Sequence, residues 1–492
     1  MSRTRIVQGN YYKISGGDHN MSSEGKIISG AGNQVRENGT GDGVYYGNFQ
    51  RKGSTVNEDF EISFSLKKDR GYSTVVPFGI LDFEGNYENA NFVFNYSLML
   101  SNIDSLEFKV LNEDGSTLYA ITNLPEIVVT ARRLPLLGED LMKNKPEHRP
   151  ADPVKVWDWK SVFDPYNISS SDYTKIGSYV IFWDGFDNNG IYDSSLFNNK
   201  KLKAVITATK NGVRKTKEVE FTTQYAKVDW VDVKIDKTNK RIDTTLRVNL
   251  KDGGAEGLEC SSHLAGARDE TRWVESCPWD KISKEALVFY KRPPIRKRQK
   301  EYHQLLEITL QGINQFWSRN SQNIGKGINI VSELYEVFVN SRTDENGLAA
   351  PKIIYQTNCE EGRSRNWELS RILYFYEGYL YRSSWKKYPN SILYNNKGWE
   401  YVDADIDDYK MVSAHEIGHE ILLTYGGQEY SKSHKNSSTI LSQKTLDTSP
   451  AIPTNGEIDL MKYYQNYYDI PRTIISEFDL LKVIWLTKIK VK

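Results

Sequence analysis

The sequence predicts a multidomain fold in which all-β modules precede a C-terminal α+β domain. At 492 residues the chain is too long for one ordinary hydrophobic core, so several domains are expected. Its first half combines frequent glycine turns with period-two apolar alternation, which is typical of antiparallel strands. From about residue 265 onward, apolar residues recur at helical spacing between strand-like runs. The predicted architecture therefore changes from all-β to α+β along the chain.

Three segments are expected before residue 154. Residues 1–55 are rich in glycine and asparagine and predict a glycine-rich region of short β-hairpins. Residues 56–125 contain alternating runs such as 60–66 and predict a small antiparallel β domain. Residues 126–153 carry proline and charge without periodicity, which indicates an inter-domain linker.

Strand patterns return in residues 154–250. An apolar run at 179–183 is followed by a turn rich in Asp and Asn at 184–190, and Asn211-Gly212 is a hairpin signal between two further runs. The Tyr…Trp-Asp-Gly-x-Asp…Gly-x-Tyr pattern here resembles the immunoglobulin-like domains of the flagellar hook-capping type. The resemblance implies an Ig-like β-sandwich. The aspartates are interpreted as turn formers, because the run lacks the spacing of an EF-hand calcium loop.

Residues 251–264 are expected to connect this module to a C-terminal domain at 265–492. Within that domain the apolar spacing of 301–317 predicts a helix. Residues 473–489 predict a terminal helix, acidic early and basic late as the helix dipole favours. Strands are predicted at 334–339 and 352–355.

Two features of this half leave alternatives open. The three cysteines match no zinc finger, so Cys260 and Cys277 form either a disulfide within the connecting segment or, with Cys359, a set of spare thiols. The basic run at 291–300 is interpreted as an exposed connector, with phosphate binding or proteolytic processing as the alternatives.

Composition argues against several classes of function. Lys+Arg and Asp+Glu both count 64, so the formal net charge is zero, unlike that of a global nucleic-acid or anionic-membrane binder. The mean hydropathy is −0.58, and the absence of a long apolar run predicts no transmembrane segment. The first residues lack the apolar stretch of a signal peptide. We therefore expect a protein that is cytoplasmic before export and is secreted or delivered without such a peptide.

The strongest chemical signal is His-Glu-x-x-His at residues 415–419. Only seven histidines occur in the chain, so a chance match is rare. On a helix, His415 and His419 lie one turn apart on the same face and can direct two imidazole nitrogens at one zinc ion. Glu416 lies off that axis and is placed to act as general base on a metal-bound water.

A catalytic zinc site usually has a third protein ligand beside its water. The glycine pair at 426–427 is expected to end the helix, so the chain has turned before His434, which is the predicted third ligand. Glu420 is disfavoured, because on a helix it projects roughly 100° away from His419. The rival oxygen ligands are Glu429, Glu457 and Asp459.

The motif and the residues after it resemble the metzincin clan of zinc peptidases. In that clan the paired histidines are followed by a glycine turn, a third histidine and a Met-turn beneath the metal. Gly426, His434 and Met461 match these features in order, although the first two lie farther along, seven and fifteen residues after His419. The resemblance implies an α+β zincin-type domain and a transition-state hydrogen bond from Tyr463. Core packing is the alternative for Met461 and Tyr463.

The whole layout resembles bacterial polymorphic toxin effectors, in which a glycine-rich delivery region and Ig-like spacers precede a toxic enzyme. Residues 124–132 are similar to a linker of such effectors. The resemblance implies delivery by a type VI-like or contact-dependent route. It also implies a secretion-apparatus tip and an immunity protein as partners.

We therefore expect a zinc metalloendopeptidase that hydrolyses a protein or peptide substrate, with no nucleic-acid partner. Glu416 would take the proton of the zinc-bound water and pass it to the leaving amine, and Tyr463 would stabilise the oxyanion. One alternative is a β-rich adhesin or secretion-tip binding protein whose structural zinc has a fourth protein ligand. The other is a zinc amidase that acts on peptidoglycan.

Overall fold

The computed structural model describes residues 59–69, 71–121, 156–158, 172–266, 271–359, 362–367, 369–382, 398–465 and 469–492. Residues Phe60–Lys492 form one compact unit. The predicted glycine-rich region 1–55 and the predicted linker 126–153 lie outside the described residues.

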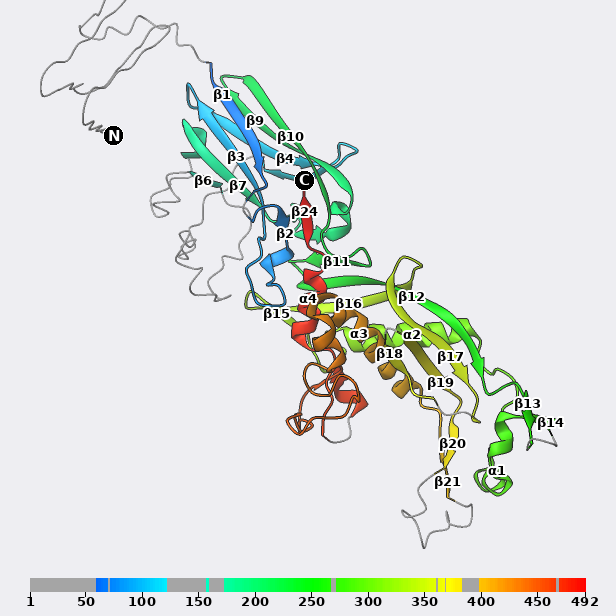
Figure 1. Ribbon diagram of the computed structural model, residues 1–492. Helices are drawn as coiled ribbons and strands as arrows, with labels where there is room; N and C mark the ends of the chain where they lie inside the picture. Colours follow the sequence, from blue (N-terminus) through cyan, green and yellow to red (C-terminus); the bar gives the residue numbers. More distant parts are fainter. Residues whose placement is uncertain are drawn as a thin grey trace, which may run out of the picture. The chain divides into compact units, whose positions relative to one another are not determined.

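Two antiparallel sheets form a β-sandwich (Figure 1). The first sheet, in the order β1-β3-β7-β6, consists of β1 (Glu61–Lys67), β3 (Phe92–Met99), β7 (Gly177–Trp183) and β6 (Val156–Asp158). The second, in the order β2-β24-β10-β9-β4-β5, consists of β2 (Thr74–Val75), β24 (Ile489–Val491), β10 (Val213–Tyr225), β9 (Lys200–Lys210), β4 (Ser105–Leu111) and β5 (Thr117–Ile121). Strands from the predicted segments 56–125 and 154–250 therefore lie together in both sheets.

Alternating apolar residues supply the core of the sandwich. Phe94 of the first sheet contacts Phe108 and Phe221 of the second, with ring centroids 5.1 and 6.0 Å away. The predicted hairpin at Asn211-Gly212 is confirmed, because β9 and β10 pair directly on either side of it. Both turn residues have left-handed φ angles, 46° and 78°, which Asn and Gly adopt at low cost.

The third sheet is mixed, with both parallel and antiparallel strand pairs, and two long helices pack against it. Its path in the order β15-β16-β12-β17-β19-β18 consists of β15 (Ile328–Ile330), β16 (Glu333–Thr343), β12 (Arg241–Glu256), β17 (Leu348–Gln356), β19 (Ser370–Tyr376) and β18 (Arg365–Trp367). The strands β11 (Val231–Asp236) and β8 (Ile191–Asp193) extend it beside β12. The inner pairs of β12 with β16 and β17, and of β17 with β19, are parallel. The strands predicted at 334–339 and 352–355 are confirmed as parts of β16 and β17.

Two long helices, α2 (Tyr302–Trp317) and α3 (Ile406–Lys432), pack against this sheet (Figure 1). The helix predicted at 301–317 is confirmed as α2, whose apolar face buries Leu305 and Phe316. The two helices cross closely at Gly312, where an added Cβ would lie 2.8 Å from the Cα of Lys410. Trp317 secures the crossing, because its indole Nε1 donates a hydrogen bond to the Ala414 carbonyl at 3.1 Å.

The helix predicted at 473–489 is shorter in the structure. Residues at its start form β23 (Thr473–Ile474), which pairs with β22 (Ile458–Asp459), and the helix α4 runs over Glu477–Trp485. The last residues leave the helix and form β24 in the sandwich. The prediction was wrong at both ends, because β pairing with other segments overrides the local helical pattern.

The remaining elements are small. The strands β13 (Ser261–Ala265) and β14 (Arg272–Ser276) form a hairpin, and a Cys260–Cys277 disulfide closes its base. Of the two alternatives for these cysteines, the disulfide is therefore the one that the structure has. Cys359 is a buried thiol. A second hairpin pairs β20 (Tyr379–Arg382) with β21 (Trp399–Val402). Helix α1 covers Lys284–Tyr290, and the 3-10 turns are η1 (Pro77–Gly79), η3 (Asp172–Thr174), η4 (Ser194–Phe197), η5 (Pro278–Lys281) and η7 (Ile470–Arg472).

The described chain is thus β-rich, with several sheets and four α-helices. None of its helices combines the length and apolar character that a membrane crossing requires. The basic run at 291–300 connects α1 to α2 and is largely exposed, as predicted. Three of its charges are in ion pairs, Arg292 with Asp403, Arg298 with Asp252 and Lys300 with Glu377.

Candidate metal centre

Three histidines gather beside the middle of α3. His415 and His419 lie on the helix, and His434 follows two residues after its end. One ligand nitrogen from each of the three lies within 4.8 Å of the others. His419 and His434 are buried, and His415 is half-buried. The helical spacing therefore brings the predicted pair together, and the third predicted ligand joins it.

Hydrogen bonds fix the orientation of all three rings. Nδ1 of His415 lies 2.7 Å from the carbonyl oxygen of Leu460, and Nδ1 of His419 lies 3.0 Å from that of Ser431. A carbonyl oxygen only accepts, so both Nδ1 atoms carry the proton. Each Nε2 is then left with a free lone pair, the form in which imidazole binds a metal.

His434 follows the same pattern with a hydroxyl partner. Its Nδ1 lies 2.6 Å from Oγ of Ser438, and that hydroxyl also lies 3.5 Å from the carbonyl oxygen of Thr439. If the Ser438 hydroxyl donates to Thr439, its oxygen is free to accept from His434 Nδ1. The Nε2 atom of His434 is buried and has no hydrogen-bond partner. A buried nitrogen without a partner is costly, and a metal ion between the rings would satisfy it.

Burial keeps the cluster neutral. It lowers the pKa of His415, and it lowers the pKa of His419 well below its usual value, with the neighbouring histidines adding to the effect. Burial, followed by the charge of His415, lowers the pKa of His434 to about 2. Neutral imidazoles are the metal-binding species, so the donor set fits a divalent ion.

The chain reaches His434 through an unusual turn. Gly427 has a φ of 74° inside α3, so the glycine pair interrupts the helix but does not end it as predicted, and helical structure continues up to Lys432. Three consecutive residues, His434, Lys435 and Asn436, then adopt left-handed φ angles of 50°, 59° and 63°. Such backbone angles are unfavourable for most residues other than glycine. Contacts with neighbouring segments must therefore hold this turn in place.

A buried ion-pair group holds the turn. The Lys435 ammonium is 2.6 Å from Oδ2 of Asp479 and also contacts the carboxylate of Asp459. Burial acts to lower the pKa of Lys435, but the two carboxylates outweigh it and leave that pKa raised. Tyr425 and Tyr430 donate to the other oxygen of Asp479, at 2.7 and 3.0 Å. Lys435 is therefore tied to α4 and to the 457–461 segment at once.

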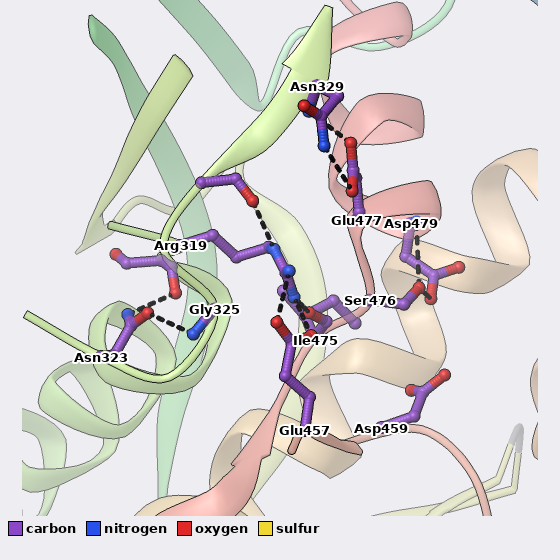
Figure 2. A network of polar contacts seen from close by, with 12 residues as sticks. Arg319, Asn323, Gly325, Asn329, Glu457, Asp459, Ile475, Ser476, Glu477 and Asp479 are labelled. Carbon is purple, nitrogen blue, oxygen red and sulfur yellow. Dashed lines mark hydrogen bonds and ion pairs between the residues drawn. The ribbon is translucent and has the colours of Figure 1, made fainter. Parts of the chain in front are cut away.

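The 457–461 segment is anchored from its other side by Arg319 (Figure 2). This buried guanidinium donates to both carboxylate oxygens of Glu457, at 2.7 and 2.8 Å, and to the carbonyl oxygen of Ile475 at 2.7 Å. Planar, two-point pairs of this kind restrict geometry strongly. The anchored segment presents the Leu460 carbonyl to His415.

Met461 lies directly beneath the histidine helix. Its side chain is fully buried, and an added Cβ on Gly418 would lie only 2.5 Å from its sulfur. Gly418 therefore lets the methionine approach the backbone between the two helical histidines. Met461 therefore packs in the core against the helix that carries His415 and His419.

Tyr463 and Glu416 also lie at the cluster. The Tyr463 ring stacks on that of His434 with a centroid distance of 3.7 Å. Burial raises the pKa of Glu416 to about 7, while Lys432 and Arg363 act in the opposite direction. Burial also raises the pKa of Tyr463, and the Glu416 charge adds to it, so the two groups are within electrostatic reach of each other.

The rival ligands are engaged elsewhere. Glu420 is buried against Arg371, with 3.0 Å between Oε1 and Nε. Glu457 pairs with Arg319 and Asp459 with Lys435, and Glu429 is exposed. Within the described ranges, the group of side chains that could hold a metal ion here consists of the three histidines alone.

Sequence reasoning missed the cations at the site. Lys432 is buried and its ammonium donates to the Asn366 carbonyl at 2.7 Å. Arg363, which precedes β18, reaches the Tyr463 hydroxyl at 3.4 Å. Neither residue carries a local motif, and only the fold brings them to the histidines.

Comparison of the chain with protein-family models, with curated proteins and with solved structures finds no match.

Proposed function

We propose that the chain is a zinc-dependent endopeptidase with His415, His419 and His434 as the zinc ligands. The observation that carries the proposal is the common orientation of the three rings. Each Nδ1 faces an oxygen atom, which leaves each Nε2 for a metal, and the buried Nε2 of His434 has no other partner.

Three nitrogen ligands with no fourth protein ligand favour catalysis over a structural role. Structural zinc sites are closed by four protein ligands, whereas catalytic sites keep one position for water or substrate. In the part of the chain that the structure describes, no Cys, Asp or Glu joins the group. A zinc ion bound there would lower the pKa of a water molecule and polarise the carbonyl of a substrate.

Glu416 is the proposed general base. It lies on α3 next to His415, and its carboxyl group is buried among the cations Lys432 and Arg363. A carboxyl group in that place can accept a proton from the attacking water and return it to the leaving amine. Tyr463, stacked on His434, is the proposed donor to the oxyanion of the tetrahedral intermediate.

An edge strand beside α3 supports a peptide as the substrate. β18 is the terminal strand of the mixed sheet and lies beside α3. Asn366, at its centre, donates from Nδ2 to the Glu416 carbonyl at 2.6 Å. A strand at a sheet edge can pair with an extended peptide through backbone hydrogen bonds. A peptide on β18 would then run past Glu416.

Replacing Glu416 with Gln tests the proposal. The variant should keep its zinc, because no ligand changes, and should lose roughly 10²–10⁴-fold in peptide hydrolysis. Glu429→Gln is the matched control, since Glu429 lies on the same helix but is exposed. Zinc content is measured by metal analysis and hydrolysis with a quenched-peptide library.

The outcomes separate the alternatives. Unchanged hydrolysis in Glu416→Gln would remove the general-base role. A wild-type protein that holds zinc but cleaves no peptide would favour a structural zinc in a binding protein. Release of stem peptides from peptidoglycan without peptide-library cleavage would favour an amidase.

The disulfide supports action outside the reducing cytosol. Cys260 and Cys277 are joined, and such bonds persist mainly in oxidising compartments. This agrees with the proposal that the enzyme is part of a delivered or secreted effector.

A further inference from the structure

We propose that Arg363 makes this site selective for peptides that carry a carboxylate next to the bond being cleaved. The inference rests on the proposed peptidase function and adds the class of substrate to it.

Arg363 lies close to the proposed metal ligands, because it contacts Tyr463, whose ring stacks on His434. It comes from the segment between β17 and β18, on the sheet side of the site. Its Nη2 atom is 3.4 Å from the hydroxyl of Tyr463, whose ring stacks on His434. The same nitrogen is 3.4 Å from Oε1 of Gln443, in the loop after His434. The guanidinium therefore bridges the two segments that border the histidine cluster.

The guanidinium is exposed and has no acidic partner among the residues that the structure describes. Other arginines of this region differ: Arg319 is paired with Glu457, and Arg371 with Glu420. Both contacts of Arg363 use Nη2 at the long limit of a hydrogen bond. Nη1 and Nε thus remain available to a substrate, and a planar fork of donors suits a carboxylate.

The other charged side chains near Arg363 also favour an anionic substrate. Arg365, on β18, donates from Nε to the Ser370 hydroxyl at 2.6 Å, and no ion pair involving it occurs in the described ranges. Lys432 adds a third cation beneath the site, held by a backbone carbonyl. Glu416 is the carboxyl group that shares this environment. A site with more fixed cations than carboxylates attracts anionic ligands.

The contacts of Tyr463 place Arg363 close to the cluster itself. The Tyr463 ring, whose hydroxyl Arg363 reaches at 3.4 Å, stacks on the rings of His434 and His415, with centroid distances of 3.7 and 6.1 Å. A substrate carboxylate at Arg363 would thus lie close to the proposed zinc ligands. That location is next to the scissile bond rather than at a remote subsite.

Binding to an inactive protein tests the inference apart from catalysis. The probes are short fluorescein-labelled peptides of one length that alternate alanine with glutamate, glutamine or lysine. They are titrated by anisotropy into zinc-loaded Glu416→Gln protein at low salt. The glutamate peptide should bind about tenfold or more tightly than the glutamine peptide, and the lysine peptide should bind most weakly.

The second step removes the guanidinium. Adding Arg363→Gln should reduce the preference for glutamate to about twofold or less, while Arg363→Lys should keep part of it, because the charge remains. Arg382→Gln is the control, since Arg382 is an exposed arginine on the distant β20–β21 hairpin. It should leave the preference unchanged.

Two results would overturn the inference. One is equal binding of the glutamate and glutamine peptides to the zinc-loaded protein. The other is an equal loss for all three peptides in Arg363→Gln, which would make Arg363 a positioning residue for Tyr463. Both results leave the peptidase proposal standing. A protein that neither holds zinc nor cleaves any peptide would instead refute the proposed function.

Discussion

At the residue scale, the site depends on the groups behind the histidines as much as on the histidines themselves. Leu460 and Ser431 orient two rings through their carbonyl oxygens, and Ser438 orients the third through its hydroxyl. Partners of this kind typically change metal affinity by about 10–100-fold when they are removed. Lys435 has a different role, since it holds the left-handed turn that carries His434.

The protonation of His434 predicts how the metal-free protein responds to pH. Burial lowers its pKa to about 2 in the folded chain, from an ordinary value of 6.5 that applies when the chain is unfolded. Between these values the unfolded chain binds the extra proton, so acid favours unfolding. The stabilisation is therefore complete above pH ~6.5 and decreases as the pH falls below it.

Urea unfolding in the presence of a chelator, at several pH values between neutral and about 5, measures this dependence. His434→Gln removes one of the titrating groups and should show a shallower decrease in the free energy of unfolding than the wild-type protein. Parallel curves for the two proteins would contradict the buried, neutral state of His434.

At the element scale, close helix packing positions the site. α2 and α3 meet at Gly312, and α3 meets Met461 at Gly418. A side chain at either glycine would push α3 away from its support. Since His415 and His419 lie on α3, the orientation of their rings depends on the absence of a Cβ at Gly312 and Gly418.

Gly312→Ala separates helix propensity from packing. In an open helix the change would stabilise by about 1 kcal/mol, because alanine is the better helix former. Here the added Cβ would meet the backbone of Lys410, which cannot rotate away, so we expect a net loss of about 1–3 kcal/mol. Gln311→Ala, at the exposed neighbouring position, is the control and should change little. Denaturant unfolding gives both values; a more stable Gly312→Ala protein would disprove the tight crossing.

At the scale of the whole molecule, the end of the chain joins the sandwich to the metal-binding part. α4 holds Lys435 through Asp479. β24 begins four residues after the end of α4 and pairs with β10 and β2 of the sandwich. The Lys488 ammonium is 2.7 Å from the Glu88 carboxylate, and Trp485 donates to the same group at 3.0 Å. One segment thus contacts both the sandwich and the part that carries the histidines.

Neighbouring residues of β24 give a matched test of this link. Ile489 is fully buried, whereas Lys490 is exposed. Ile489→Ala should cost about 2–5 kcal/mol of unfolding free energy, and Lys490→Ala should stay within about 0.5 kcal/mol. Because the segment is shared, Ile489→Ala should also lower the temperature at which the protein releases zinc. Calorimetry with a zinc indicator measures both, and zinc release at an unchanged temperature would show that the two parts unfold independently.

The local patterns of the sequence were reliable where neighbouring residues decide the structure. The helical spacing predicted α2, the Asn211-Gly212 pair predicted its hairpin, and the alternation at 60–66 predicted β1. The predicted helix at 473–489 failed at both ends. There, pairing of β23 with β22, and of β24 with β10 and β2, outweighed a local preference of small size.

The sequence by itself determined that His415 and His419 face one point, because a helix repeats every ~3.6 residues and both lie on one helix. It also nominated His434, Met461 and Tyr463 by their order along the chain. The tertiary structure alone decided that His434 joins the pair, that Met461 packs beneath it and that Arg363 lies beside it. These contacts join segments that no periodicity relates, so only the packing of the folded chain brings them together.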